Sequence, residues 1–154
     1  MFSGLPTTTR ATGRAWCFLV ANLQEQTTMI ELLSEAAGTL IRLAVVPMGT
    51  DLCVAVFGGH RPHIGAVALA EPRPSLRDNR VTSATVSVLA VTGHKEDELA
   101  RTVARDMASA LNVRVSVSCG IHVDQAQHVH IREIVNAVDA LTRQVIQQLQ
   151  ARGR

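Results

Sequence analysis

The sequence predicts an α+β fold, with a mostly antiparallel sheet that carries two helices on one face, in the order ββββαβα. Three observations support this prediction. Four β-favouring runs come first, apolar residues then recur at a helical period, and a strand and a second amphipathic helix complete the chain. At 154 residues the chain has the size of one compact domain.

The N-terminal segment differs from the rest of the chain. Residues 1–28 have no clear hydrophobic period, so we expect a poorly patterned N-terminal segment followed by a single domain over 29–154. The apolar run at 15–21 is short for a signal-peptide core, and no run reaches the ~20 residues of a membrane span. The odd set Cys17, Cys53 and Cys119 predicts buried thiols in a reducing compartment. We therefore expect a soluble, cytoplasmic protein without membrane contact.

The first half of the domain predicts four strands. Runs at 40–46 and 52–57 flank the turn-forming sequence PMGTD and predict a hairpin. Strands at 64–70 and 81–91 follow, joined by the exposed connection EPRPSLRDN. Ser83, Thr85 and Ser87 place three hydroxyls on one face of the last of these strands. Such a row usually faces solvent, but here it leads towards Gly93 and favours a pocket.

The second half predicts two helices around one strand. Leu99, Val103, Met107 and Leu111 recur at four-residue steps, and Asn112 is a suitable C-terminal cap. The acidic sequence at 95–98 (KEDE) suits the positive end of the helix dipole. Residues 113–119 alternate as a half-buried strand, and 131–151 form an amphipathic helix that covers the sheet or a partner.

Two segments carry candidate binding groups. In the loop GGHRPHIG, the glycines Gly58, Gly59 and Gly65 allow close backbone approach, and Arg61 offers a planar fork to a phosphate or carboxylate. At the start of the first helix, free amides together with the sequence Gly93-His94-Lys95 favour an anion, although the acidic residues that follow oppose one. A solvated glycine-rich hairpin and simple dipole compensation remain open alternatives.

Histidine spacing does not predict a metal site. His60 and His63 form HxxH on a turn, which lacks the helical spacing of the zinc-protease motif, and no cysteine pair supports it. His128 and His130 form HxH. There is no GxSxG motif, so we expect no catalytic residue and no enzyme activity. A net charge of +2 and an aromatic content of 3% argue against nucleic-acid binding.

Several separated motifs resemble one known family. GGHRPHIGAVALA, PRPSL, SVLAVTGHKEDELAR and GIHVD occur in this order between residues 39 and 149. They resemble the LpdD-like prenylated-flavin chaperones, accessory proteins of UbiD-type decarboxylases. The resemblance implies a homodimer with a fold like that of a proteasome assembly chaperone. It also implies a non-enzymatic carrier that binds reduced prenylated flavin mononucleotide (FMN) and delivers it to the decarboxylase.

The resemblance implies a cofactor site at the matching positions: Gly58, Gly59, His60, Arg61, Pro62, His63, Gly65, Gly93, His94, Lys95 and His122. Within this set we expect Arg61 and the backbone of 59–65 to bind the phosphate. We expect His63, His94 and His122 to form hydrogen bonds with the isoalloxazine or ribityl groups. Because the chain has few aromatic residues, the walls of a flavin slot must be aliphatic.

Two rival functions stay open at this point. One is a small histidine- or metal-dependent hydrolase that uses His60, His63, His94 and His122. The other is an assembly factor whose C-terminal helix docks a partner and whose loop is merely structural.

Overall fold

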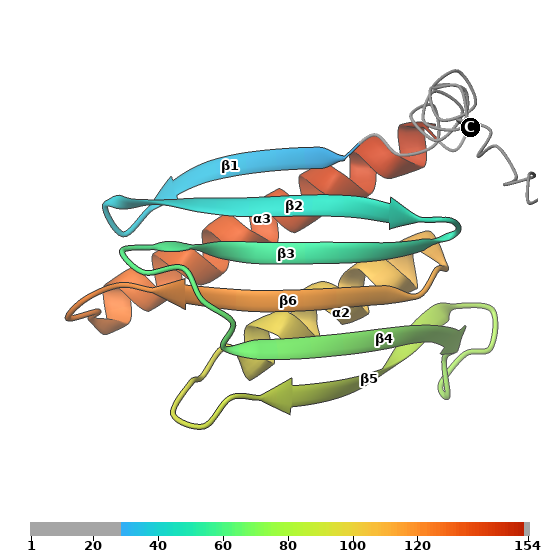
Figure 1. Ribbon diagram of the computed structural model, residues 1–154. Coiled ribbons are helices and arrows are strands. Elements are labelled where there is room, and N and C mark those ends of the chain that lie inside the picture. Colours follow the sequence, from blue (N-terminus) through green and yellow to red (C-terminus); the bar gives the residue numbers. More distant parts are fainter. Residues whose placement is uncertain (1–28, 153–154) are drawn as a thin grey trace, which may run out of the picture.

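The computed structural model describes residues 29–152 and shows one six-stranded sheet with two helices on the same face (Figure 1). This confirms the predicted α+β class. The elements are β1 (Ile30–Ala36), β2 (Thr39–Met48), β3 (Asp51–Gly59), β4 (Ala66–Pro74), β5 (Thr82–Ala90), α2 (Asp97–Leu111), β6 (Val115–His122) and α3 (His128–Arg152). The predictions for residues 1–28 lie outside the described residues.

The sheet has the strand order β1-β2-β3-β6-β4-β5. All neighbouring strands are antiparallel except β3 and β6, which form one parallel pair. Because β6 lies between β3 and β4, the chain that leaves β3 must cross the end of β6 before it starts β4. Residues 60–65 make this crossing, which explains why the loop is more than a simple hairpin turn.

The core lies between the sheet and the two helices. Alternate side chains of the central strands face the helices and are fully buried, including Leu43, Val54 and Val117. In Figure 1, α2 lies behind β6, β4 and β5, whereas α3 lies behind β1 and β2. Asn112 ends α2 in the left-handed conformation, as its predicted role as a C-terminal cap requires.

Strand β1 was missing from the predicted order, which is βββββαβα within the described residues. It is an edge strand whose Glu31 and Glu35 face solvent, so its apolar pattern is weak. The β1–β2 hairpin turns at Ala37 and Gly38, both at positive φ (53° and 67°). Such turns usually carry Asn-Gly or Asp-Gly, and an alanine at the first position hides the signal.

Two further expectations were wrong. The hydroxyls of Ser83, Thr85 and Ser87 lie on the sheet face away from the helices, where Thr85 accepts a hydrogen bond from Arg73 Nε at 2.8 Å. They do not line the cavity, because the alternate residues of the strand, Ala84, Val86 and Val88, are the ones that face α2. Cys53 is exposed on the same open face, whereas Cys119 is fully buried as expected. No helix in residues 29–152 is long and apolar enough to cross a membrane.

Candidate ligand-binding site

The crossing loop is held tightly against the end of β6. The backbone N–H of His60 donates to the carbonyl of His122 at 2.7 Å, and that of Gly65 donates to the carbonyl of Cys119 at 2.9 Å. Gly59 has a φ of 82°, and a Cβ there would lie 2.1 Å from the carbonyl oxygen of His122. A side chain at this position is therefore excluded twice, by conformation and by space.

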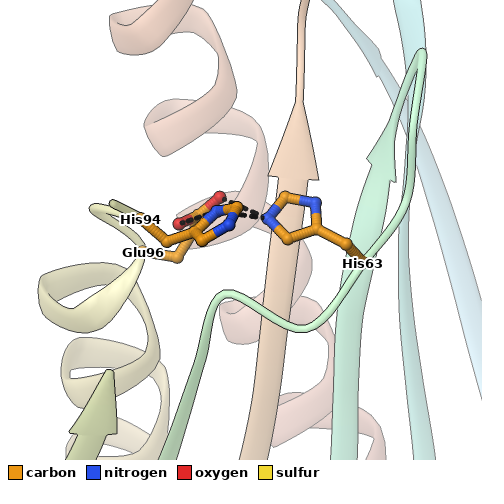
Figure 2. A group of neighbouring side chains, drawn as sticks. All are labelled: His63, His94 and Glu96. Atoms are coloured by element: carbon orange, nitrogen blue, oxygen red, sulfur yellow. Dashed lines mark hydrogen bonds and ion pairs between the residues drawn. The ribbon is translucent and has the colours of Figure 1, made fainter. Parts of the chain in front are cut away.

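The loop brings His63 against the start of α2, where it meets His94 and Glu96 (Figure 2). His63 Nε2 lies 2.8 Å from His94 Nδ1 and 3.2 Å from Glu96 Oε1. His94 Nδ1 lies 3.7 Å from Glu96 Oε2. We call these three residues the His63 cluster. It joins two segments that sequence analysis had singled out separately.

Glu96 takes part in this cluster because it does not cap its own helix. It is the residue before α2, and its side chain makes no capping hydrogen bond. Its carboxylate instead turns towards the loop and accepts a hydrogen bond from the backbone N–H of Lys95 at 2.9 Å. A Cβ on Gly65 would lie 2.5 Å from Glu96 Oε2, so the glycine leaves room for this carboxylate. Dipole compensation is left to Asp97 and Glu98.

A second group of polar side chains adjoins the first; we call it the Arg61 cluster. Arg61 Nη2 donates to Asp124 Oδ1 at 2.5 Å and lies 2.6 Å from His122 Nε2. The backbone N–H of Asp124 donates to His60 Nδ1 at 3.1 Å. The hydrogen bond from Arg61, together with the one involving His122, holds the pKa of the Asp124 carboxyl below its usual range. The rings of His63 and His122 are 6.3 Å apart, so the two clusters are neighbours.

A cavity of about 700 Å³ lies between α2 and α3, over the end of β6. Its polar end consists of Gly93, His94, Lys95, Glu96 and His122. Most of its wall residues are aliphatic and come from both helices and from the end of β6: Leu99, Val103, Ile121, Val123, Ile131, Ile134, Val135 and Val138. The lining also contains acidic and other polar side chains: Glu98, Thr102, Asp106, Asn136, Asp139 and Thr142. The volume and the mainly apolar lining are those of a small-molecule site, for which ~300–1,000 Å³ is usual.

The predicted site residues fall into two groups. Gly93, His94, Lys95 and His122 line the cavity, and His63 contacts it through His94 and Glu96. The others lie beside the lining, at the end of β3 (Gly58 and Gly59) or in the crossing loop (His60, Arg61, Pro62 and Gly65). The four histidines of the hydrolase alternative do not converge, because His60 and His122 belong to the Arg61 cluster.

Sequence analysis missed several residues that shape the site. Glu96 was assigned to dipole compensation, and Asp124 was not among the predicted site residues. The α3 wall of the cavity was not foreseen, because the helical period does not distinguish a residue that lines a cavity from one that packs in the core. Glu96 contacts His63 only because the fold places the crossing loop beside α2.

The chain is similar to known proteins over most of its length. Residues 35–150 match the family model of the prenylated flavin chaperone LpdD-like domain. The chain is 30% identical over 125 residues to Protein LpdD of Lactiplantibacillus plantarum (strain ATCC BAA-793 / NCIMB 8826 / WCFS1), a match that covers 80% of this chain and 87% of the relative.

A solved structure is similar as well. It is described as the crystal structure of a novel chaperone complex for yeast 20S proteasome assembly. The alignment has a TM-score of 0.49 and 12% identity, and it covers 82% of this chain and 97% of the other. The family match spans both segments that form the His63 cluster and nearly all of the described fold. The chain therefore belongs to the family of prenylated flavin chaperone LpdD-like domains.

Proposed function

We propose that this protein is a non-enzymatic carrier that binds reduced prenylated FMN and delivers it to a UbiD-type decarboxylase. The observation that carries the proposal is the mainly aliphatic cavity with a polar end that contains His94, Lys95 and His122, in a chain of this family. A flavin needs a site with an apolar part and a polar end, because its ring system is largely apolar and its phosphate is a dianion. Membership of a chaperone family supports a client protein as the recipient.

The apolar part of the cavity suits the ring system. Leu99 on α2, Ile131 on α3 and Ile121 at the end of β6 line the cavity and keep accessible surface. No phenylalanine, tyrosine or tryptophan lines the cavity in the described part of the chain. Contact with the ring would therefore be aliphatic, and it would contribute free energy in proportion to the apolar area removed from water.

The polar end offers donors to a phosphate, although the carboxylate of Glu96 lies at the same end. Lys95 lies in the lining just before α2, and the first backbone N–H groups of this helix receive no side-chain cap from Glu96. Arg61 stands next to His122, and both of its side-chain contacts use Nη2, so Nε and Nη1 take no part in them. Charge-assisted hydrogen bonds of about 1.5–3 kcal/mol each would hold the cargo firmly enough to carry and weakly enough to release.

The test is an anaerobic binding experiment with the full chain. Protein is mixed with reduced prenylated FMN, or with ordinary reduced FMN, and passed over a size-exclusion column. We expect the prenylated flavin to co-elute with the protein, and the loaded protein to activate a purified apo-decarboxylase of the UbiD type. If neither flavin co-elutes, the carrier function is wrong.

Two substitutions locate the phosphate. Arg61→Ala and Lys95→Met should each weaken flavin binding by about 1.5–3 kcal/mol and change thermal stability little, because both residues are exposed. Arg77→Ala is the matched control, since Arg77 is an exposed arginine in the β4–β5 connection, outside the lining. Affinity equal to wild type in both variants would remove the phosphate from this end. If Arg61→Ala also left decarboxylase activation intact, the loop would be merely structural and the assembly-factor function would be favoured.

A further inference from the structure

We propose that the His63 cluster binds one divalent transition-metal ion, of the zinc class, at the polar end of the cavity. The sequence did not predict this site, because its ligands come from the crossing loop and from the start of α2, far apart in the chain. Three donor atoms converge there: Nε2 of His63, Nδ1 of His94 and a carboxylate oxygen of Glu96. All lie within 4.8 Å of one another (Figure 2).

The spacing of these atoms suits a single ion. Two ligand atoms that are each about 2.0–2.1 Å from a tetrahedral zinc ion lie about 3.3 Å apart. The two histidine nitrogens are 2.8 Å apart, His63 Nε2 lies 3.2 Å from Glu96 Oε1, and His94 Nδ1 lies 3.7 Å from the other carboxylate oxygen, Oε2. These distances lie on either side of about 3.3 Å. A side-chain rotation that brings one carboxylate oxygen towards both nitrogens would place the three donors around one ion.

The hydrogen bonds around the cluster are those that orient metal ligands. His63 Nδ1 lies 3.1 Å from the carbonyl oxygen of Arg61, which only accepts, so Nδ1 carries the hydrogen. In the neutral ring the lone pair is then on Nε2, the atom that faces Glu96 and His94. Metal-binding histidines almost always make such a bond through their other nitrogen. The Glu96 carboxylate is held in turn by the backbone N–H of Lys95.

The charge of the cluster also favours a cation. The Glu96 side chain is only 14% exposed, and among the described residues no Lys or Arg side chain forms an ion pair with it. A mostly buried carboxylate beside a histidine lone pair favours a positive charge between them. A proton on His63 would supply one charge, whereas a divalent ion would supply two and satisfy all three donors.

The ligand set determines what the ion can do. Two imidazoles and one carboxylate leave at least one coordination position open, and His94 and Glu96 line the cavity. This part of the inference rests on the proposed function: the open position would take an anionic oxygen of the phosphorylated cargo. The ion would also resolve a conflict at the polar end, where the carboxylate of Glu96 alone would repel a phosphate.

The primary test measures metal binding without flavin. Full-length protein without an affinity tag is treated with a chelator, dialysed and titrated with zinc chloride by calorimetry. We expect one equivalent to bind, and cobalt to give the visible absorption of a tetrahedral site. Glu96→Gln and His63→Gln should each weaken zinc binding by more than about 100-fold, with melting temperatures close to that of wild type.

A matched control uses His128→Gln, which removes a histidine at the start of α3, outside the cluster. It should leave zinc binding unchanged. The proposal is overturned if wild type binds no zinc, or if zinc binding survives Glu96→Gln and His63→Gln, and loss of binding in His128→Gln would place the ion elsewhere.

A second readout separates this inference from the proposed function. Reduced prenylated FMN is titrated into zinc-loaded and chelator-treated protein, and we expect binding at least about tenfold tighter with zinc, the worth of one charge-assisted contact. Zinc binding without any flavin binding would overturn the carrier function and leave the metal site standing. Equal flavin affinity in the two forms would overturn the role of the open position.

Discussion

Glu96 shows how a single residue changes role when the chain folds. By its position it is one of three acidic residues at a helix start, and the physics of the helix dipole is enough to account for it. In the structure it bends back, takes the space that Gly65 leaves empty and contacts two histidines. The sequence contained each of these residues among the candidates or their neighbours. Their convergence depends on a strand order that no local pattern encodes.

At the residue scale, Asp124 gives a prediction about pH. The hydrogen bond from Arg61 is the largest cause of its lowered pKa, so Arg61→Ala should raise that pKa towards the ordinary value. A lowered pKa stabilises the fold above the unfolded-state pKa, and this contribution is lost as pH falls through the folded-state pKa. The variant should therefore lose less stability between neutral pH and strong acid. An NMR titration of the Asp124 carboxyl carbon measures the pKa directly.

Arg80→Ala provides the matched control for this titration. Arg80 lowers the pKa of Asp78 in the same way, at a distant surface turn. Its removal should raise the pKa of Asp78 and leave that of Asp124 unchanged. An Asp124 pKa that does not respond to Arg61→Ala would contradict the assigned cause.

A second residue-scale prediction concerns Cys119. Burial, together with the charge of Glu96, raises the pKa of its thiol to about 12. Because the thiolate is the reactive form, the folded protein should react with a thiol reagent about 1,000-fold more slowly than a free cysteine at mildly alkaline pH. The measurement uses a Cys17→Ser, Cys53→Ser variant in which Cys119 is the single thiol. The same variant in denaturant should react at the ordinary rate, and rapid reaction of the folded form would refute the prediction.

At the scale of elements, the sequence predicted those with strong periodicity and missed the one without it. The apolar steps of α2 and the alternation in β6 are set by burial on one side, so both were correct. The edge strand β1 was missed because polar Ser34 lies on its inner side and apolar Leu33 is exposed on its outer side, which blurs the alternation, and because its turn uses Ala37. Strand order was beyond local reasoning as well, since β6 pairs with β3 and β4 through contacts distant in sequence.

The loop between β3 and β4 supports a prediction that separates two glycines. Gly59→Ala should destabilise the protein by about 2 kcal/mol or more, because the new methyl meets the backbone of His122 at a positive φ. Gly65→Ala should cost much less, since its new methyl meets the end of the flexible Glu96 side chain. Thermal unfolding measures both. Equal melting temperatures for the two variants would contradict the expected difference in stability. Gly65→Ala should nevertheless weaken zinc binding, because the Glu96 side chain must move.

At the scale of the whole molecule, the sheet is covered on one face only (Figure 1). The open face carries exposed Val46, Val67, Leu69 and Leu89 around small residues of the central strands. Exposed apolar side chains that neighbour one another across strands are typical of an interface. We propose, in line with the homodimer that the sequence resemblance implies, that two copies pack sheet to sheet, with their helices outside.

This arrangement predicts the behaviour of a charged substitution. Leu69→Asp should shift the protein from the mass of two chains to that of one in light scattering at micromolar concentration. A buried charge at a sheet interface is costly, and the helix-covered core is untouched. Exposed Cys53 lies on the same face and should react faster with a thiol reagent in the variant. Leu76→Asp, on the exposed β4–β5 connection, is the control and should keep the wild-type mass. Wild-type protein with the mass of one chain would refute the arrangement.

The late position of β6 in the chain has a consequence for biogenesis. While the ribosome is still making residues up to Leu111, the two β-hairpin groups have no strand between them, since the joining strand is Val115–His122. Pairing between strands that are distant in sequence is slow, because the chain loses loop-closure entropy before the stabilising contacts form. The cavity between α2 and α3 is then the last region to assemble, and the proposed function predicts that nascent or truncated chains that lack this strand do not bind flavin.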